Sequence, residues 1–216
     1  MFSFESKDAI LWDNDGVLVD TEKYFYEAAR QVLKKAGFDF TRQMFTELVL
    51  IKAVGPWFLL KERGYDDEFI LRMKSERDDL YVHYLRTEKI LIDGVEEILQ
   101  ELSGKVLMGI VTSSKPRHFY AIHSRTNILK YMDFVITPED YKLYKPDPEP
   151  YFTGWRKTNL AKEKCVVVED SERGLLSAKA AGLDCIVIPN EMTLHSDFSQ
   201  ADMLLNNVME LRNLLR

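Results

Sequence analysis

A short apolar run gives way to acidic residues in the stretch Leu11-Trp12-Asp13-Asn14-Asp15-Gly16-Val17-Leu18-Val19-Asp20-Thr21. A strand that ends at Asp13 places this side chain at the carboxyl edge of a sheet, where open α/β folds bind their ligands. A local turn then brings Asp13 and the backbone of Asp15 to one hard cation, and leaves the second carboxylate for proton transfer. The alternative is an ordinary acidic turn, because Asp, Asn and Gly are common turn residues. Residues further along the chain distinguish the two.

The composition indicates a folded protein without a basic surface. Its 216 residues are 46% apolar, enough for a core of one or two domains, and the net charge is −6. With no concentrated basic run, we expect neither nucleic acid nor a membrane surface as a partner. The N-terminus has acidic residues where a secretory peptide needs an apolar segment, and no run is long enough to span a membrane. Cys165 and Cys185 stand beside aliphatic runs and predict buried thiols, so we expect a cytoplasmic protein.

Strand and helix patterns alternate near both ends of the sequence. Apolar runs predict strands at residues 9–13, 106–112, 134–137, 165–169, 185–188 and 202–205. Helical patterns lie between most of them, and Asp93-Gly94-Val95-Glu96 resembles a capping box that opens a helix to about Leu102. This alternation predicts an α/β fold with a parallel sheet and helices on both faces.

The segment between the first two strands contains helical patterns alone. Apolar residues recur at helical spacing within residues 21–36, 42–48, 56–63 and 66–85, and Gly37 is a plausible stop for the first helix. We therefore expect a helical domain at residues 20–88, inserted into a core formed by residues 1–19 and 89–216.

Four predicted strands end in polar residues. The first ends in Asp13 and Asp15, and the second in Thr112-Ser113-Ser114, whose hydroxyl and backbone N–H groups suit a phosphate. Lys145 follows the third strand in a proline-rich loop, and Glu169-Asp170 follows the fourth, where two carboxylates complete a metal site.

Each of these features has an ordinary structural explanation as well. Thr112 to Ser114 could cap a helix, Lys145 could be a solvated loop lysine, and Glu169 with Asp170 could open a helix, where the macrodipole favours carboxylates. Together, however, they supply a nucleophilic carboxylate, a hydroxyl, an ammonium group and metal-binding carboxylates at successive strand ends. The combination favours a catalytic site.

In these residues the sequence resembles the haloacid dehalogenase-like hydrolase superfamily over nearly its whole length. The stretch from Asp13 to Thr21 is similar to the first motif of the family, Thr112 to the second and Lys145 to the third. The fourth motif is matched by Glu169-Asp170-Ser171 with Gly174 and Ala181-Gly182. The branch it resembles is that of the β-phosphoglucomutase-like phosphatases, which implies a Rossmann-like core and a helical cap domain at residues 20–88.

The resemblance also implies roles for the matching residues. Asp13 would attack phosphorus to give an aspartyl-phosphate, and Asp15 would act as general acid and then as base. Mg²⁺ would be bound by Asp13, the backbone carbonyl of Asp15 and Asp170, with Glu169 in support. Thr112 and Lys145 would bind the phosphoryl oxygens. We also expect substrate contacts from Ser113, Ser114 and Lys115.

The predicted function is Mg²⁺-dependent hydrolysis of a small phosphorylated metabolite, such as a sugar phosphate. Dehalogenases and phosphonatases of the superfamily lack a carboxylate at the place of Asp15, so its presence favours phosphate esters. The alternatives are a sugar-phosphate mutase and a noncatalytic binding protein on the same scaffold. Phe25 occupies the place where relatives commonly carry a histidine that assists the acid–base cycle of the mutase, which favours the phosphatase. The four histidines, His83, His118, His123 and His195, show no metal spacing, and we expect surface or capping roles for them.

Overall fold

The apolar runs of the sequence form one sheet of six parallel strands in a computed structural model, which describes residues 4–214. The strands are short, and their order in the sheet is β3-β2-β1-β4-β5-β6. They are β1 (Ala9–Trp12), β2 (Leu107–Val111), β3 (Phe134–Ile136), β4 (Cys165–Glu169), β5 (Asp184–Val187) and β6 (Met203–Leu204). Each bound lies within two residues of the sequence prediction, and the predicted α/β fold with a parallel sheet is confirmed.

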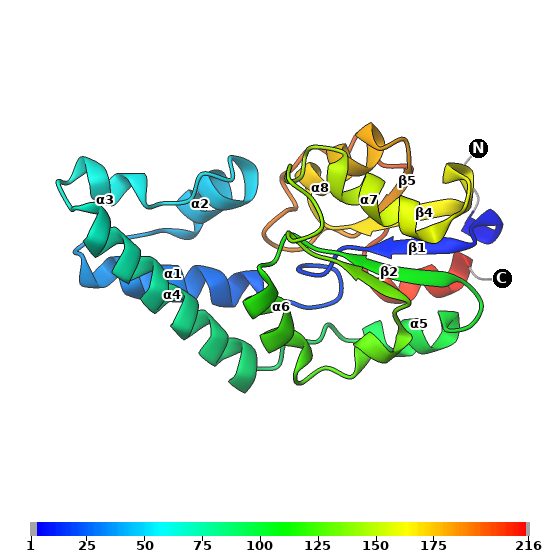
Figure 1. Cartoon of the computed structure of the whole chain (residues 1–216), viewed down its shortest axis with the longest axis horizontal. Helices are drawn as coiled ribbons and strands as arrows, with labels where there is room; N and C mark the ends of the chain where they lie inside the picture. Colours follow the sequence, from blue (N-terminus) through cyan, green and yellow to red (C-terminus); the bar gives the residue numbers. More distant parts are fainter. Residues whose placement is uncertain (1–3, 215–216) are drawn as a thin grey trace. The chain divides into compact units, whose positions relative to one another are not determined.

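Alternate side chains of the strands point to opposite faces of the sheet, and each face is covered by helices (Figure 1). Ile10 and Trp12 of β1 pack with α5 (Val95–Leu102), α6 (Pro116–His123) and the 3-10 helix η5 (Val208–Leu214). Ala9 and Leu11 face α7 (Glu149–Thr158) and α8 (Glu172–Ala180). Burial on both faces explains why the strands read as continuous apolar runs. Short 3-10 helices complete this part of the chain: η1 (Phe4–Ser6), η3 (Ile128–Tyr131) and η4 (Lys162–Lys164).

The segment Thr21–Lys89 forms a separate compact unit, while the residues before and after it form the unit that contains the sheet. The secondary-structure elements of the inserted unit are all helices: α1 (Glu22–Lys35), α2 (Arg42–Phe45), the π-helix η2 (Thr46–Ile51), α3 (Phe58–Glu62) and α4 (Asp67–Thr87). An aromatic cluster packs inside it. Phe25 contacts Tyr81 edge-to-face with 5.1 Å between ring centroids, and Phe45 at 6.3 Å.

Two local details differ from the sequence prediction. The N-cap of α5 is Gly94, with φ +84°, and not Asp93, as the capping-box pattern predicts. The helix predicted at residues 42–48 is α-helical only to Phe45 and continues as a π-turn, in which Lys52 N–H donates to Glu47 O. An α-turn and a π-turn differ by one residue per hydrogen-bonded ring, which the apolar spacing of so short a segment does not distinguish.

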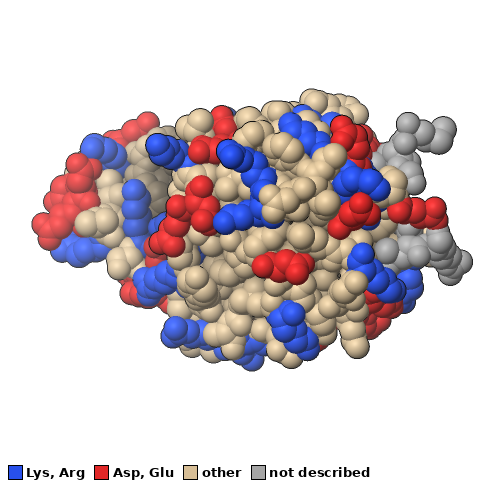
Figure 2. Space-filling view, turned by 45° about the vertical axis from the view of Figure 1, so that its right-hand side comes forward, with Lys and Arg blue, Asp and Glu red and all other residues tan. Residues whose placement is uncertain are grey.

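Basic and acidic side chains are interspersed over the face of the molecule shown in Figure 2. Neither sign gathers into one broad patch there. Among the described residues, no helix is both long and apolar enough to cross a membrane.

Candidate active site

The three central strands of the sheet end side by side, and each ends in polar residues. Trp12 pairs with Ile110 of β2 and with Val168 of β4, so Asp13 is level with Val111 and Glu169. The Asp13 N–H donates to Val168 O at 2.9 Å, which continues the strand pairing to this residue. The parallel register therefore brings carboxylates from two strands to one edge of the sheet.

Lys145 connects these two carboxylates. Its Nζ lies 2.6 Å from Asp13 Oδ1 and 2.8 Å from Glu169 Oε1, and it also donates to Val111 O at 3.1 Å. All three charged side chains are buried. Burial alone lowers the pKa of Lys145, but the two carboxylates outweigh it and raise the pKa above its ordinary value. The ammonium group is therefore held charged between Asp13 and Glu169.

Glu169 is surrounded by hydrogen-bond donors. Its Oε1 accepts from Lys145 and, at 2.8 Å, from the Tyr151 hydroxyl. Its Oε2 accepts from the N–H groups of Asp170 and Ser171 and from Ser171 Oγ, at 2.9–3.1 Å. Burial raises the pKa of this carboxyl, but Lys145 and these hydrogen bonds outweigh burial and lower the pKa. Glu169 is thus an ionised anchor for Lys145.

Asp13, Glu169 and Asp170 each offer a carboxylate oxygen, and these oxygens lie within 4.8 Å of one another. Burial raises the pKa of Asp13 to about 7; Lys145 opposes this shift and Glu169 adds to it. Lys145 Nζ contacts two of these three buried carboxylates, Asp13 and Glu169, so the acidic groups of the cluster exceed the ammonium groups that contact it. Oxygen donors with that excess suit a hard divalent cation such as Mg²⁺. The donor set therefore fits the predicted metal.

Asp170 is held in place by Asn190 and by the absence of a side chain at Gly16. Asn190 Nδ2 donates to Asp170 Oδ2 at 2.7 Å. Gly16 has φ +92°, and a Cβ at this position would collide with the same oxygen. Glycine is therefore required in the turn after Asp15 for two reasons, the backbone conformation and the space that Asp170 occupies.

Asp15 lies in the turn after β1 and is half-buried. Its Oδ2 accepts hydrogen bonds from Ser114 Oγ at 2.6 Å, from Asn14 Nδ2 at 3.1 Å and from Thr112 Oγ1 at 3.4 Å. Thr112 and Ser114 follow β2, so the second strand end contacts the first, as the sequence motifs predict. Seven of the predicted residues thus gather at one edge of the sheet: Asp13, Asp15, Thr112, Ser114, Lys145, Glu169 and Asp170.

The two remaining predicted residues lie in the same loop as Thr112 and Ser114. Ser113 is half-buried in the loop after β2, and Lys115 is exposed at the N-cap of α6. In the inserted unit, Lys52 is exposed and pairs with Glu47 at 2.6 Å. The guanidinium of Arg77 lies over the rings of Phe25 and Trp57, at 4.2 and 5.4 Å from the centroids.

Three contributors to the site escape the sequence analysis: Asn14, Tyr151 and His123. The Tyr151 hydroxyl lies 2.9 Å from Lys145 Nζ. His123 Nε2 forms a hydrogen bond of 2.9 Å with Asn14 Oδ1, and Asn14 Nδ2 donates to Asp15. A surface position, one of the two roles expected for the histidines, is wrong for His118 and His123, which are both buried. No local motif connects His123 to a partner 109 positions away.

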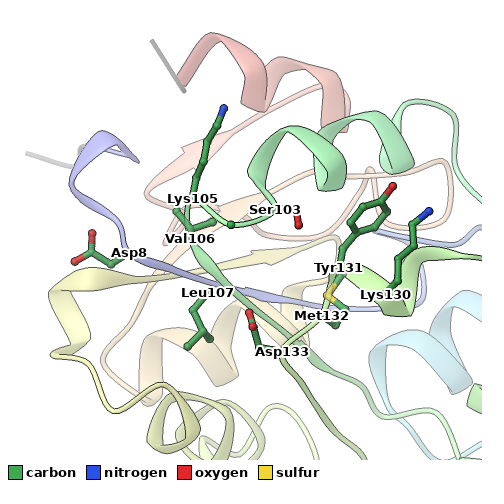
Figure 3. A pocket seen from close by; sticks show the side chains of 10 residues that line it. Asp8, Ser103, Lys105, Val106, Leu107, Lys130, Tyr131, Met132 and Asp133 are labelled. Carbon is green, nitrogen blue, oxygen red and sulfur yellow. The ribbon is translucent and has the colours of Figure 1, made fainter.

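A pocket of about 380 Å³ lies at the opposite edge of the sheet (Figure 3). Asp8 precedes β1, Leu107 opens β2 and Asp133 precedes β3, so the pocket is at the amino ends of the strands. It carries none of the residues of the four motifs. The candidate site is therefore the carboxyl edge, in agreement with the general rule for open α/β sheets.

Residues 10–188 match the family described as haloacid dehalogenase-like hydrolases. The chain belongs to this family. The resemblance inferred from the four motifs is thus confirmed for most of the length of this haloacid dehalogenase-like hydrolase.

Individual relatives of this hydrolase cover nearly the same span. The phosphorylated carbohydrates phosphatase of Thermotoga maritima is 30% identical over 83% of this chain and 83% of its own. The crystal structure of CbbY from Rhodobacter sphaeroides in complex with phosphate is 25% identical, covers 95% of this chain and 96% of its own, and has a TM-score of 0.80. The β-phosphoglucomutase of Clostridium difficile, at 21% identity and a TM-score of 0.77 over 97% of each chain, shares the fold.

Proposed function

We propose that this protein is a Mg²⁺-dependent phosphatase that hydrolyses a small phosphorylated sugar through an aspartyl-phosphate on Asp13. The observation that carries the proposal is the buried ion pair of Asp13 Oδ1 and Lys145 Nζ, which are 2.6 Å apart. Asp13 also lies close to Asp170, and it precedes Asp15 by two residues in the sequence. Membership in a hydrolase family and a 30% identical phosphatase of phosphorylated carbohydrates support the reaction class and the kind of substrate.

In the first step, a carboxylate oxygen of Asp13 attacks phosphorus, and the bond between phosphorus and the ester oxygen breaks. Asp15 gives its proton to the departing alkoxide, which leaves as the alcohol. Asp15 suits this task because it lies two residues after Asp13 in the same turn and is half-buried, so that it can reach a substrate. The product of the step is an acyl phosphate on Asp13.

In the second step, Asp15, now a carboxylate, accepts a proton from water while the water oxygen attacks the phosphorus of the aspartyl-phosphate. Inorganic phosphate leaves, and Asp13 is restored as a carboxylate. The same group therefore works as acid and then as base, and no net proton is taken from Asp15 over the cycle.

Lys145 and Thr112 bind the phosphoryl oxygens in this proposal. Lys145 is positioned by Glu169 and Tyr151, so its charge is fixed before the substrate arrives. A preorganised charge of this kind stabilises the transition state without reorganisation. We assign Ser113, Ser114 and Lys115 to the substrate-binding loop after β2, with Ser114 also holding Asp15.

Asp13, Asp170 and the backbone carbonyl of Asp15 would hold Mg²⁺, and Glu169 would support the site by binding Lys145. When bound, the ion offsets the repulsion between an anionic nucleophile and an anionic phosphate. At about 4 Å that repulsion is about 4 kcal/mol per pair of unit charges at an effective dielectric of 20, which is large enough to require a cation.

The surroundings of Phe25 favour hydrolysis over phosphate transfer between positions of a sugar. The Phe25 ring packs against Tyr81 and carries the Arg77 guanidinium 4.2 Å from its centroid. A phenyl ring carries no proton to exchange, so this position adds no second acid or base. We therefore rank the phosphatase above the mutase.

We also propose that the helical unit at residues 20–88 is a cap domain that selects the substrate, and that the enzyme works in the cytoplasm. Within this unit the buried Arg77 lies against two aromatic rings and pairs with Asp78 at 2.8 Å, so its charge is already balanced inside the unit. Cys165 and Cys185 are free and buried, as expected in a reducing compartment. Exchange of this unit with that of a relative should change the order of preferred substrates.

The test is phosphate release from a panel of monoesters: fructose 1-phosphate, glycerol 3-phosphate, phosphoglycolate and β-glucose 1-phosphate. We expect release that requires Mg²⁺ and is abolished by Asp13→Asn. Isomerisation of β-glucose 1-phosphate that depends on a bisphosphate primer would establish the mutase instead. If Asp13→Asn retains full activity, the aspartyl-phosphate proposal fails.

A further inference from the structure

A chain of hydrogen bonds connects α6 with the Asp15 carboxyl group. His123, the last residue of α6, has Nε2 2.9 Å from Asn14 Oδ1 and Nδ1 2.7 Å from Thr126 Oγ1. Asn14 Nδ2 in turn donates to Asp15 Oδ2 at 3.1 Å. In this chain, His123 contacts Asn14, which lies between Asp13 and Asp15 in the sequence, and Asn14 contacts Asp15.

The direction of every bond follows from the chemistry of the groups. An Asp15 carboxylate can only accept, so Asn14 must present its amide nitrogen to it. The amide oxygen of Asn14 then faces His123 and requires a donor, so Nε2 carries the proton of the neutral ring. Nδ1 is left as an acceptor, which the Thr126 hydroxyl satisfies. Reversal of the Asn14 amide would place an oxygen against the carboxylate, and His123 prevents this reversal.

The surroundings of His123 keep the ring neutral and in one place. The ring packs on buried Phe119 with 4.4 Å between ring centroids, and its side chain is buried. Burial lowers the pKa of His123 to about 4, with the nearby Asp15 opposing the shift. Asn14 itself is fully buried, and its backbone oxygen accepts from the N–H groups of Leu18 and Val19.

We propose that His123 is a positioning residue for Asp15: it holds the Asn14 amide in one orientation, and the Asn14 hydrogen bond to Oδ2 then fixes the orientation of the carboxyl group that protonates the leaving group. Three groups converge on Oδ2: the hydroxyls of Ser114 and Thr112 can donate or accept, whereas Asn14 Nδ2 can only donate. The Asn14 amide is therefore the contact that fixes which way this oxygen faces. The inference rests on the proposed function, in which Asp15 is the general acid.

The test is a matched pair of substitutions, His123→Gln and His123→Asn. Glutamine places an amide nitrogen where the imidazole has Nε2, and so keeps a donor to Asn14 Oδ1. Asparagine is shorter and reaches only the position of Nδ1, beside Thr126. Both variants are neutral polar amides, so they differ mainly in the contact with Asn14.

Two Mg²⁺-supported substrates separate positioning of an acid from a general effect on structure. Fructose 1-phosphate has a poor alkoxide leaving group that needs a proton, whereas 2,4-dinitrophenyl phosphate releases a stable phenolate. We compare kcat/KM, which covers only the steps through formation of the aspartyl-phosphate. His123→Asn should lower it about tenfold or more for the sugar ester and less than about threefold for the aryl ester. His123→Gln should restore most of the loss.

An equal loss on both substrates, or equal behaviour of the two variants, overturns the proposal. If His123→Asn does not fold, Thr126→Val carries the test, because it removes the partner of Nδ1 from a half-buried site. It should lower kcat/KM for the sugar ester alone, and no selective loss would overturn the proposal. The Asp13→Asn variant distinguishes failure of this proposal from failure of the proposed function. If Asp13→Asn is inactive while His123→Asn keeps the wild-type kcat/KM on both substrates, the phosphatase mechanism is supported and the role of His123 is refuted.

Discussion

Lys145 Nζ lies 2.6 Å from Asp13 Oδ1, and both side chains are buried at the carboxyl edge of the sheet. The proposed nucleophile is thus paired with a buried cation of the chain itself. The same contact serves the fold, because a buried carboxylate without a partner is strongly unfavourable. Stability and activity should consequently depend on the same atoms here.

Replacement of Lys145 by Met should abolish phosphatase activity and lower the free energy of unfolding by about 3–5 kcal/mol, because two buried carboxylates lose their partner. Urea denaturation and phosphate release measure the two effects. Lys142→Met is the control, since Lys142 is an exposed lysine of the same loop. An equally small effect of both substitutions would contradict the assigned role of Lys145.

Tyr151→Phe removes the hydroxyl that contacts Lys145 and Glu169 and leaves the ring in place. We expect a loss of about 1.5–3 kcal/mol in stability, since both partners are charged. The kcat should fall several-fold with KM little changed, because Lys145 loses one of its four contacts. Tyr120→Phe, at an exposed tyrosine of α6, should change stability by less than about 0.5 kcal/mol. Identical results for the two variants would refute the prediction.

Gly16→Ala should weaken Mg²⁺ binding, because the added Cβ displaces Asp170 Oδ2. Gly64 offers a matched control: it has a similar positive φ, +86°, and nothing lies within 4 Å of a Cβ built there. Both variants should lose about 1 kcal/mol from backbone strain. Only Gly16→Ala should require about tenfold more Mg²⁺ for half-maximal activity, measured by titration of the metal. The same requirement in Gly64→Ala would disprove the steric argument.

The neutral state of buried His123 predicts a pH dependence of stability. A histidine in the unfolded chain titrates near 6.5, whereas the folded-state pKa is about 4. Between these values the unfolded state binds more protons, so this group destabilises the fold as the pH falls from about 6.5 to 4, by up to about 3 kcal/mol. His123→Gln should flatten that part of the curve of unfolding free energy against pH. Parallel curves for wild type and variant would contradict it.

The sequence alone predicts those features that depend on local pattern. Strands β1 and β4 are buried on both faces and therefore read as apolar runs, as at Cys165–Glu169, and the motif residues Asp13 and Glu169 stand where these runs end. The parallel register then brings Asp13 and Glu169 together without further information. The family follows from the same residues.

What the sequence does not predict is set by contacts between distant segments. His123 forms a hydrogen bond with Asn14 across 109 positions, and Tyr151 forms one with Glu169 across 18. Neither pairing leaves a periodic signal in the sequence. Gly94 caps α5 through a positive φ, although Asp93 and Glu96 have the spacing of a capping box. In each case tertiary packing overrides a weak local preference.

The hydrogen bond from Asp20 N–H to Ile90 O, 2.8 Å long, has a consequence for how this enzyme can vary. With the bridge between Val19 and Leu91, it joins the two points where the chain leaves the sheet-bearing unit and returns to it. The loop that the insertion closes is therefore already anchored at its base, and lengthening a closed loop costs little: about 0.6 kcal/mol for each doubling. Insertions of quite different length and sequence can be accommodated at this junction, while β1 and β4, which position Asp13 and Glu169, keep their register.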